Sequence, residues 1–306
     1  MSFSSEVKEE LAGQTGKSRH CRLAELSAII CHAGKLKAGK GNVTLGIETE
    51  NSLLKEKYRH FLLLLYGIAL EETEELSGEQ LLKVLESVKI WDKNKGSFSD
   101  MSCVDGMLIQ QSCCRRAFIR GAFLASGSIS DPNKAYHLEI VCDTIAKAEQ
   151  LQAVMKTFDV EAKIITRKKH EVVYVKEGAH IVDLLNVMEA HVALMNLENV
   201  RIVKEMRNSV NRQVNCETAN ISKTVNAAVR QIEDIIYIRD KKGLDSLPDN
   251  LREIAMLRLE YPDMALKELG TCLNPPVGKS GVNHRLRKIS EIAEEMGLKR
   301  MGGESK

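Results

Sequence analysis

The side chains best suited to chemistry lie close together near the end of the sequence, in residues 279–288. No acidic residue occurs between Glu268 and Glu291, whereas four lysines and arginines do. Arginine can bond guanine O6 and N7 at once, and asparagine can do the same with adenine N6 and N7. The segment predicts base reading in the major groove of DNA. The candidate DNA-binding residues are Lys279, Ser280, Asn283, His284, Arg285, Arg287 and Lys288.

Helical spacing divides this segment into two sides. With about 100° of rotation per residue, Val282, Leu286 and Ile289 share one apolar side, and Asn283 and Arg287 lie opposite. Lysine and serine at the start of the helix suit phosphate, with help from backbone N–H groups, while Arg285 lies nearer the core edge. The alternative is a small helical bundle with a solvated charged side.

Two shorter helical patterns, about 248–260 and 264–273, precede the basic helix, which is expected over about 279–296. Asp263 is the expected N-cap of the middle helix, and residues 274–278, with two prolines, end it. Two short helices followed by a basic third are typical of a helix-turn-helix.

Earlier in the chain, two similar segments end at Gly34 and Gly127, 93 residues apart. Each half shows the order helix, two strands, helix, strand, helix. The expected strands are 42–48 and 135–141, then 68–72 in the first half and a hairpin over 160–175 in the second. The expected later helices are 51–66, 77–89, 143–158 and 178–188. We predict an α+β fold with two repeated halves, 1–100 and 101–195, a helical linker, 196–245, and an all-α DNA-binding domain, 246–306.

The composition excludes several classes of protein. The chain has 306 residues, 43% hydrophobic and 28% charged, and its 4% of aromatic residues disfavours a stacking platform for single strands. Its longest apolar run, 61–66, is too short for a membrane span, and the start lacks an apolar signal. The eight cysteines form no CxxC or His-paired cluster, and the adjacent Cys113 and Cys114 suit packing. We therefore expect a cytoplasmic, nucleoid-associated protein with no membrane partner, metal or cofactor.

Several long blocks of sequence resemble the WhiA family of bacterial DNA-binding proteins. They are MSFSSEVKEEL at the start, CCRRAFIRGAFLASGSISDP (113–132), NRQVNCETANISKTVNAA (211–228) and GKSGVNHRLRKISEIAEEM near the end. The resemblance implies a saddle of two αββαββα-type halves, similar to LAGLIDADG homing endonucleases, and a helix-turn-helix like the promoter-reading domain of sigma factors. It also implies roles in transcriptional control, sporulation, cell division and chromosome segregation, with double-stranded promoter DNA as the partner.

The same resemblance bears on nuclease activity. A LAGLIDADG nuclease places an acidic residue just before the last glycine of each motif helix, where the two carboxylates hold Mg²⁺. The matching residues here are Ala33 and Ser126, which cannot serve as anionic ligands. Asp131, Glu139, Glu48 and Glu50 could bind metal only with a different geometry. We expect no enzymatic activity, with a surviving endonuclease as the disfavoured alternative.

A second surface for DNA or a partner is expected on the saddle, where strands supply the DNA contacts of the related nucleases. Its candidate residues are Arg115, Arg116 and Arg120 before the second motif, and Lys163, Arg167, Lys168 and Lys169 on the hairpin, beside His170. The alternative is a hairpin kept soluble by its charges. A third reading of the whole chain is an interaction protein whose main partner is RNA polymerase or its sigma factor.

Overall fold

The protein divides into two compact units, Met1–Glu205 and Met206–Lys306. The computed structural model describes residues 2–38, 43–71, 75–98 and 101–297. One long helix, α8 (His191–Lys242), begins in the first unit and ends in the second. Each unit has a hydrophobic core of its own.

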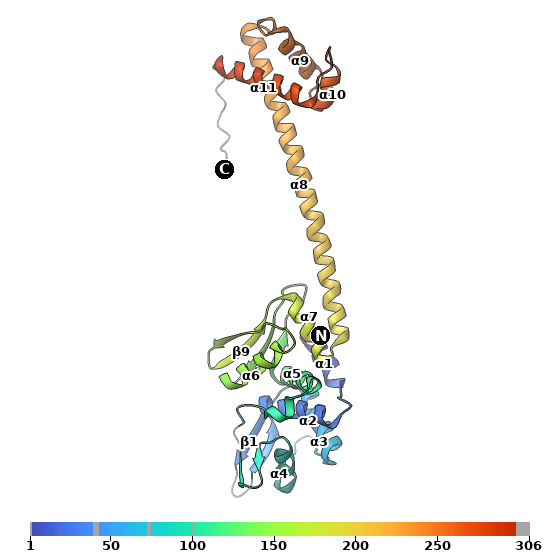
Figure 1. The fold of residues 1–306 in the computed structure, drawn as a ribbon, viewed down its shortest axis with the longest axis vertical. Coiled ribbons are helices and arrows are strands. Elements are labelled where there is room, and N and C mark those ends of the chain that lie inside the picture. Colours follow the sequence, from blue (N-terminus) through green and yellow to red (C-terminus); the bar gives the residue numbers. More distant parts are fainter. Residues whose placement is uncertain (1, 39–42, 72–74, 99–100, 298–306) are drawn as a thin grey trace. The chain divides into compact units, whose positions relative to one another are not determined.

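Two helices, α2 (Arg19–Ala33) and α5 (Ser112–Ser126), pack against each other at the centre of the first unit (Figure 1). Gly121 permits this close packing, because a Cβ there would lie 2.7 Å from the backbone oxygen of Glu25 and 2.9 Å from the Cβ of Ala28. Real Cβ atoms do not approach so closely, so only glycine fits at this crossing. The two predicted motif helices thus form the axis around which the halves are arranged.

Each central helix leads directly into a strand of its own antiparallel sheet. The first sheet has the order β1 (Gly34–Ala38), β2 (Val43–Ile47), β3 (Leu76–Ser77). The second has the order β6 (Gly127–Ile129), β7 (Leu138–Cys142), β9 (His170–Val175), β8 (Lys163–Arg167). Gly34 pairs with Ile47, and Gly127 pairs with Ile140, so the register also repeats after 93 residues. The predicted α+β repeat is confirmed.

Further helices surround this frame, and the expected ones lie within a few residues of their predicted bounds. They are α1 (Phe3–Gly13), α3 (Ser52–Tyr66), α4 (Gly78–Ser87), α6 (Ile145–Lys156) and α7 (Gly178–Met188). The strand expected at 68–72 is wrong over its described residues, 68–71. The amide of Ile68 instead bonds to Leu62 O as α3 ends, with Gly67 left-handed, and the third strand follows at β3.

The segment between the halves contains a short strand pair, β4 (Trp91–Asp92) with β5 (Ser97–Phe98), and the short 3₁₀ helix η1 (Gly106–Ile109).

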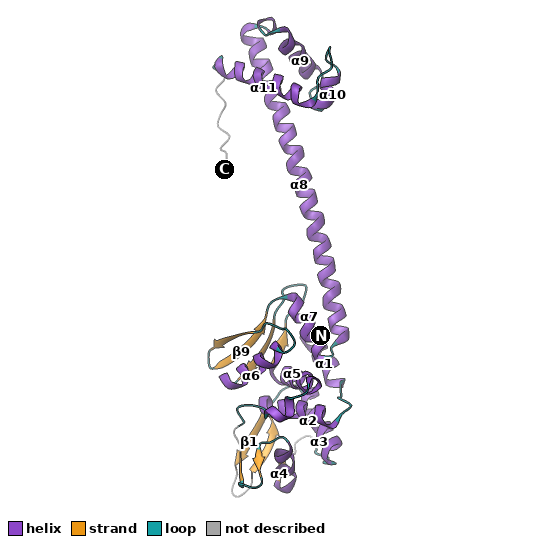
Figure 2. Cartoon of the chain, in the orientation of Figure 1, coloured by secondary structure: helices purple, strands orange, loops and turns teal. Residues whose placement is uncertain are grey.

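The described part of the second unit consists of helices and the loops between them, without a strand (Figure 2). It contains the end of α8, then η2 (Leu244–Ser246), α9 (Asp249–Glu260), α10 (Leu266–Thr271) and α11 (Lys279–Glu295). Its core includes Ile235 and Ile238 of α8, both fully buried. The boundary expected at 246 therefore cuts through this core, and the last turns of the expected linker help to form the domain.

Within the described part of the chain, no helix is both long and apolar enough to cross a lipid bilayer.

Candidate nucleic-acid interface

The turn between α10 and α11 depends on two glycines. A Cβ on Gly270 would lie 2.0 Å from the backbone oxygen of Val277, and one on Gly281 would lie 2.3 Å from the Cγ1 of the same valine. The Val277 amide donates to Gly270 O at 2.9 Å, which closes the turn. The N-cap expected at Asp263 is wrong, because α10 begins later, after Ala265. Close approach at Gly270 and Gly281 fixes how α11 packs on α10.

One side of α11 is buried, as the helical spacing predicts. Val282, Leu286, Ile289 and Ala293 are each at most 1% exposed and belong to the core of the second unit. An amphipathic helix held along this side keeps its other side exposed, and its side chains there can contact a partner without disturbing the fold.

The other side of α11 carries the polar candidates. Lys279, Ser280, Asn283, His284, Arg287 and Lys288 are all exposed. Arg285 is half-buried and its Nη1 donates to Asn250 O at 3.4 Å, in keeping with its expected place near the core edge. Arg287 forms an ion pair with Glu291, with 3.4 Å between Nε and Oε1. Because 81% of the arginine side chain is exposed, this weak surface pair leaves the guanidinium free to find a better partner.

A groove beside α11 is lined partly by residues of the segment that was expected to be a linker, 196–245. Lys223, Asn226 and Arg230 of α8 line it together with Asn283 and Arg287. Ser290 Oγ donates to Asp234 Oδ2 at 2.5 Å and so holds α11 against α8. The sequence does show that the stretch 211–232 is rich in asparagine and cationic residues. No local pattern, however, reveals that this stretch lies beside α11.

The two residues expected at the carboxylate positions of the nucleases lie at corresponding helix ends. Ala33 and Ser126 are the last residues of α2 and α5, and Ser126 Oγ donates to Ala122 O of its own helix. Near the end of α2, Lys147 Nζ donates to Cys31 O at 2.6 Å and pairs with Asp143 at 2.8 Å. Within the described ranges, no group of three or more metal-ligating side chains converges there.

Three of the four acidic residues that could bind metal with a different geometry have other contacts. Glu48 pairs with Lys35 at 2.9 Å, and Glu139 pairs with His137 at 3.0 Å. Asp131 accepts from the backbone and side chain of Asn133, and these hydrogen bonds hold its pKa below the ordinary value. These contacts are those of ordinary surface carboxylates.

The strands of the first unit carry cations that are partly neutralised. Lys37 pairs with Glu75 at 2.5 Å, and Arg167 pairs with Glu139 at 3.3 Å. Lys163, Lys168 and Lys169 are exposed on β8 and the hairpin turn, as expected, beside the exposed His170. The sheets therefore offer mixed charge, in contrast to the cationic start of α11.

Three arginines were expected on the second surface for DNA or a partner, and for Arg120 this expectation is wrong. It is 2% exposed, and its guanidinium bonds Glu25 at 2.8 Å and Glu189 at 2.6 Å. Glu25 also pairs with the buried Lys57 at 2.5 Å. A buried carboxylate must be paired with cations, so Arg120 joins α5 to α2 and is unavailable to a partner. Helical spacing alone does not show that Arg120 faces the buried contact between α5 and α2.

The other two arginines are also engaged within the first unit. Arg115 Nε donates to Ile109 O at 3.1 Å, and the guanidinium of Arg116 lies 5.7 Å from the ring centre of Phe158. Both side chains are half-buried, so they support the fold and contribute only part of their surface to any partner.

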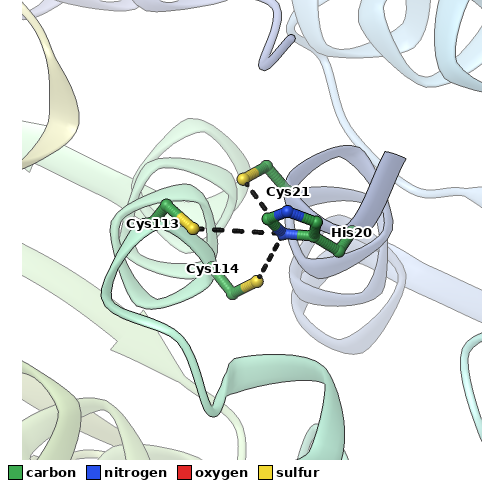
Figure 3. Close-up of side chains that lie close together, drawn as sticks. All are labelled: His20, Cys21, Cys113 and Cys114. Atoms are coloured by element: carbon green, nitrogen blue, oxygen red, sulfur yellow. Dashed lines mark hydrogen bonds between the residues drawn. The ribbon is translucent and has the colours of Figure 1, made fainter. Parts of the chain in front are cut away.

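A cluster of His20, Cys21, Cys113 and Cys114 corrects the expectation that no cysteine pairs with histidine (Figure 3). Cys114 is buried, as a packing residue would be, but Cys113 is exposed. The two residue pairs are far apart in sequence and neither forms a CxxC motif, which is why a motif search misses them. Their separation of 93 residues, equal to the repeat, was the available signal.

Comparisons with known proteins agree along nearly the whole chain. Family models match residues 19–76 (WhiA N-terminal LAGLIDADG-like domain), 115–207 (WhiA LAGLIDADG-like domain) and 210–293 (WhiA C-terminal HTH domain). A "Probable cell division protein WhiA" from Lachnoclostridium phytofermentans is 50% identical over 309 residues, covering 96% of this chain and 99% of its own. One from Alkaliphilus oremlandii is 50% identical, covering 97% of this chain and 98% of its own.

A solved structure shows the same architecture. The full-length DUF199/WhiA from Thermatoga maritima superposes with a TM-score of 0.57 at 25% identity, covering 96% of this chain and 99% of that one. With family models for both LAGLIDADG-like domains and for the C-terminal HTH domain, and with relatives that are 50% identical along nearly the whole chain, the chain belongs to the WhiA family.

Proposed function

We propose that this protein is a non-enzymatic regulator of transcription that binds promoter DNA through α11. The observation that carries the proposal is the division of α11 into a buried apolar side and an exposed side with Asn283, Arg287 and Lys288. A helix of this kind can enter the major groove while its packed side remains in the domain core. The relatives' name supports a role in cell division, and the family resemblance adds chromosome segregation or sporulation.

Charge supports α11 over the saddle as the DNA-binding surface. Lys35, Lys37 and Arg167 on the strands pair with carboxylates, which reduces the net positive charge that the sheets present to phosphate. The start of α11 instead presents Lys279 together with first-turn amides that have no side-chain cap among the described residues. Such a helix start attracts phosphate.

The groove beside α11 adds cations from α8. Lys223 and Arg230 line it together with Arg287, and Glu291 and Glu294 of α11 also line it. In this arrangement Asn283 and Arg287 read base edges. The phosphate backbone of the DNA is contacted by Arg230 and by the three lysines, Lys223, Lys279 and Lys288. Base contacts then specify the sequence while phosphate contacts supply much of the affinity.

The ends of the two motif helices support the absence of nuclease activity as part of this proposal. Ala33 and Ser126 end the two motif helices, so the chain lacks the carboxylate pair that would hold Mg²⁺ between the halves. The fold then provides a scaffold without phosphodiester chemistry.

Salt-dependent binding by the full-length protein tests the proposal. Chromatin immunoprecipitation would identify natural sites, and affinity for one of them would be measured between 50 and 200 mM salt. Four phosphate contacts predict a slope of about −4 for log affinity against log salt concentration. A slope near zero, with tight binding to RNA polymerase or its sigma factor, would favour the interaction protein instead.

A further inference from the structure

Four side chains at the starts of α2 and α5 have the composition and spacing of a metal site (Figure 3). They are His20, Cys21, Cys113 and Cys114, and their candidate ligand atoms all lie within 4.8 Å of one another. Three sulfur atoms surround a single ring nitrogen. Nδ1 of His20 lies 3.1 Å from Cys114 Sγ, 3.4 Å from Cys21 Sγ and 3.9 Å from Cys113 Sγ.

The three nitrogen–sulfur distances are close to those of a zinc site. Bonds of about 2.3 Å to sulfur and about 2.05 Å to nitrogen at tetrahedral angles place a nitrogen and a sulfur about 3.6 Å apart. The three observed separations fall on both sides of that value. The small span also suits one ion, since the outer ligands of a polynuclear cluster bind different metal atoms. We infer that His20, Cys21, Cys113 and Cys114 bind one Zn²⁺.

The repeat provides independent support for this site. His20 and Cys113, like Cys21 and Cys114, are 93 residues apart, as are the glycines that end the two helices. Counting from the N-caps Ser18 and Gln111, each half supplies its second and third helical residues. The ligand set is therefore shared equally between the halves, so that one bound ion would link the first half to the second.

The segments that lead into the two helices repeat as well. Arg22 Nε donates to Gly16 O at 2.6 Å, and Arg115 Nε donates to Ile109 O at 3.1 Å. Both arginines bond a carbonyl six residues earlier, so the first turn of each helix is held in the same way. The N–H groups of a first turn also carry partial positive charge, which favours thiolates and offsets the net −1 of a Zn²⁺ with three thiolates and a neutral histidine.

The coordination points to a structural metal. Four protein ligands complete a tetrahedron and leave no position for a water or a substrate. The cluster lies about 18 Å along α2 from Ala33, given 1.5 Å of rise per residue. It is thus at the opposite end of the helix pair from the lost nuclease site. The ion would tie α2 to α5 across the two halves of the first unit.

Metal analysis of the full-length protein tests the inference. Protein stripped by a chelator under reducing conditions would be reconstituted with Zn²⁺ and analysed by mass spectrometry for metals. One zinc per chain is expected, and Co²⁺ in its place should give the absorption of a tetrahedral thiolate complex. Absence of bound zinc, or a preference for iron or copper, would overturn the assignment, as would a disulfide within the cluster that forms in place of metal binding.

Two cysteine variants provide the comparison. Cys113→Ser changes an exposed ligand, and Cys216→Ser changes an exposed cysteine of the second unit as the matched control. The first should weaken zinc binding by more than about 100-fold, since substitutions that merely support a ligand cost about 10- to 100-fold. The control should bind zinc like the unchanged protein. Equal affinity in both, with both shown to be folded by circular dichroism, would refute the site.

Discussion

The end of α8 is predicted to be an essential part of the DNA-binding unit. A fragment of residues 246–306 keeps α9, α10 and α11 but loses Ile235 and Ile238, both fully buried in the core they share. It also loses Asp234, which accepts the hydrogen bond of Ser290 on α11. We expect this fragment to be unfolded, whereas residues 206–306 should fold and bind DNA.

The magnitude follows from burial. Each fully buried isoleucine contributes about 1.5–3 kcal/mol, so the two together contribute about 3–6 kcal/mol. The hydrogen bond to the Asp234 carboxylate adds about 1.5–3 kcal/mol. A domain is stable by only about 5–15 kcal/mol in total. The truncation therefore removes a share comparable to the whole stability.

A point substitution tests the same reasoning without truncation. Ile238→Ala should lower the free energy of unfolding of residues 206–306 by about 2–5 kcal/mol, measured by urea denaturation with circular dichroism. Ile221→Ala on the same helix is the matched control, because Ile221 is 64% exposed and its loss should cost under about 0.5 kcal/mol. Equal effects of the two substitutions, or a cooperatively folded 246–306 fragment with full affinity, would refute the reasoning.

Three further predictions concern the nuclease positions, pH and the turn. Purified protein with Mg²⁺ or Mn²⁺ should bind DNA without cutting it, because Ala33 and Ser126 replace the carboxylates; specific cleavage on gels would contradict this. Burial lowers the pKa of His32 to about 4, so the unfolded chain takes up a proton near pH 6.5 that the native protein does not. The free energy of unfolding should fall from pH 6.5 to 4 by at most about 3 kcal/mol, and His32→Gln should flatten this profile in urea titrations. Gly270→Ala should cost about 1–3 kcal/mol in thermal unfolding, because the new methyl would overlap Val277 O; an unchanged melting temperature would count against the close approach.

Much of the fold could be predicted because the spacing of apolar residues along each helix or strand is typical of that element. The apolar residues of α11 recur at helical spacing, and the order of elements repeats after 93 residues. The strand expected at 68–72 failed because local β-propensity does not show that the amide of Ile68 is used to end α3.

Features that depend on contacts between distant segments could not be predicted in this way. Arg120 resembles a surface cation in sequence, and its burial depends on Glu25, 95 residues away. The boundary of the second unit was placed after Gly243 and before Pro248, where the helix pattern breaks, although the core already begins at Ile235. The His20–Cys21 and Cys113–Cys114 pairs become a cluster only once the two halves pack together.

Binding-site selection on α11 variants tests the central claim most directly. Asn283→Ala and Arg287→Ala should each lose about 1–3 kcal/mol of discrimination at one or two base positions, with folding nearly unchanged because both side chains are exposed. Lys279→Ala should instead weaken binding to all sequences alike and flatten the salt slope by about one unit. Selected motifs that stay the same in both Asn283→Ala and Arg287→Ala would contradict the assignment of α11 as the helix that reads DNA.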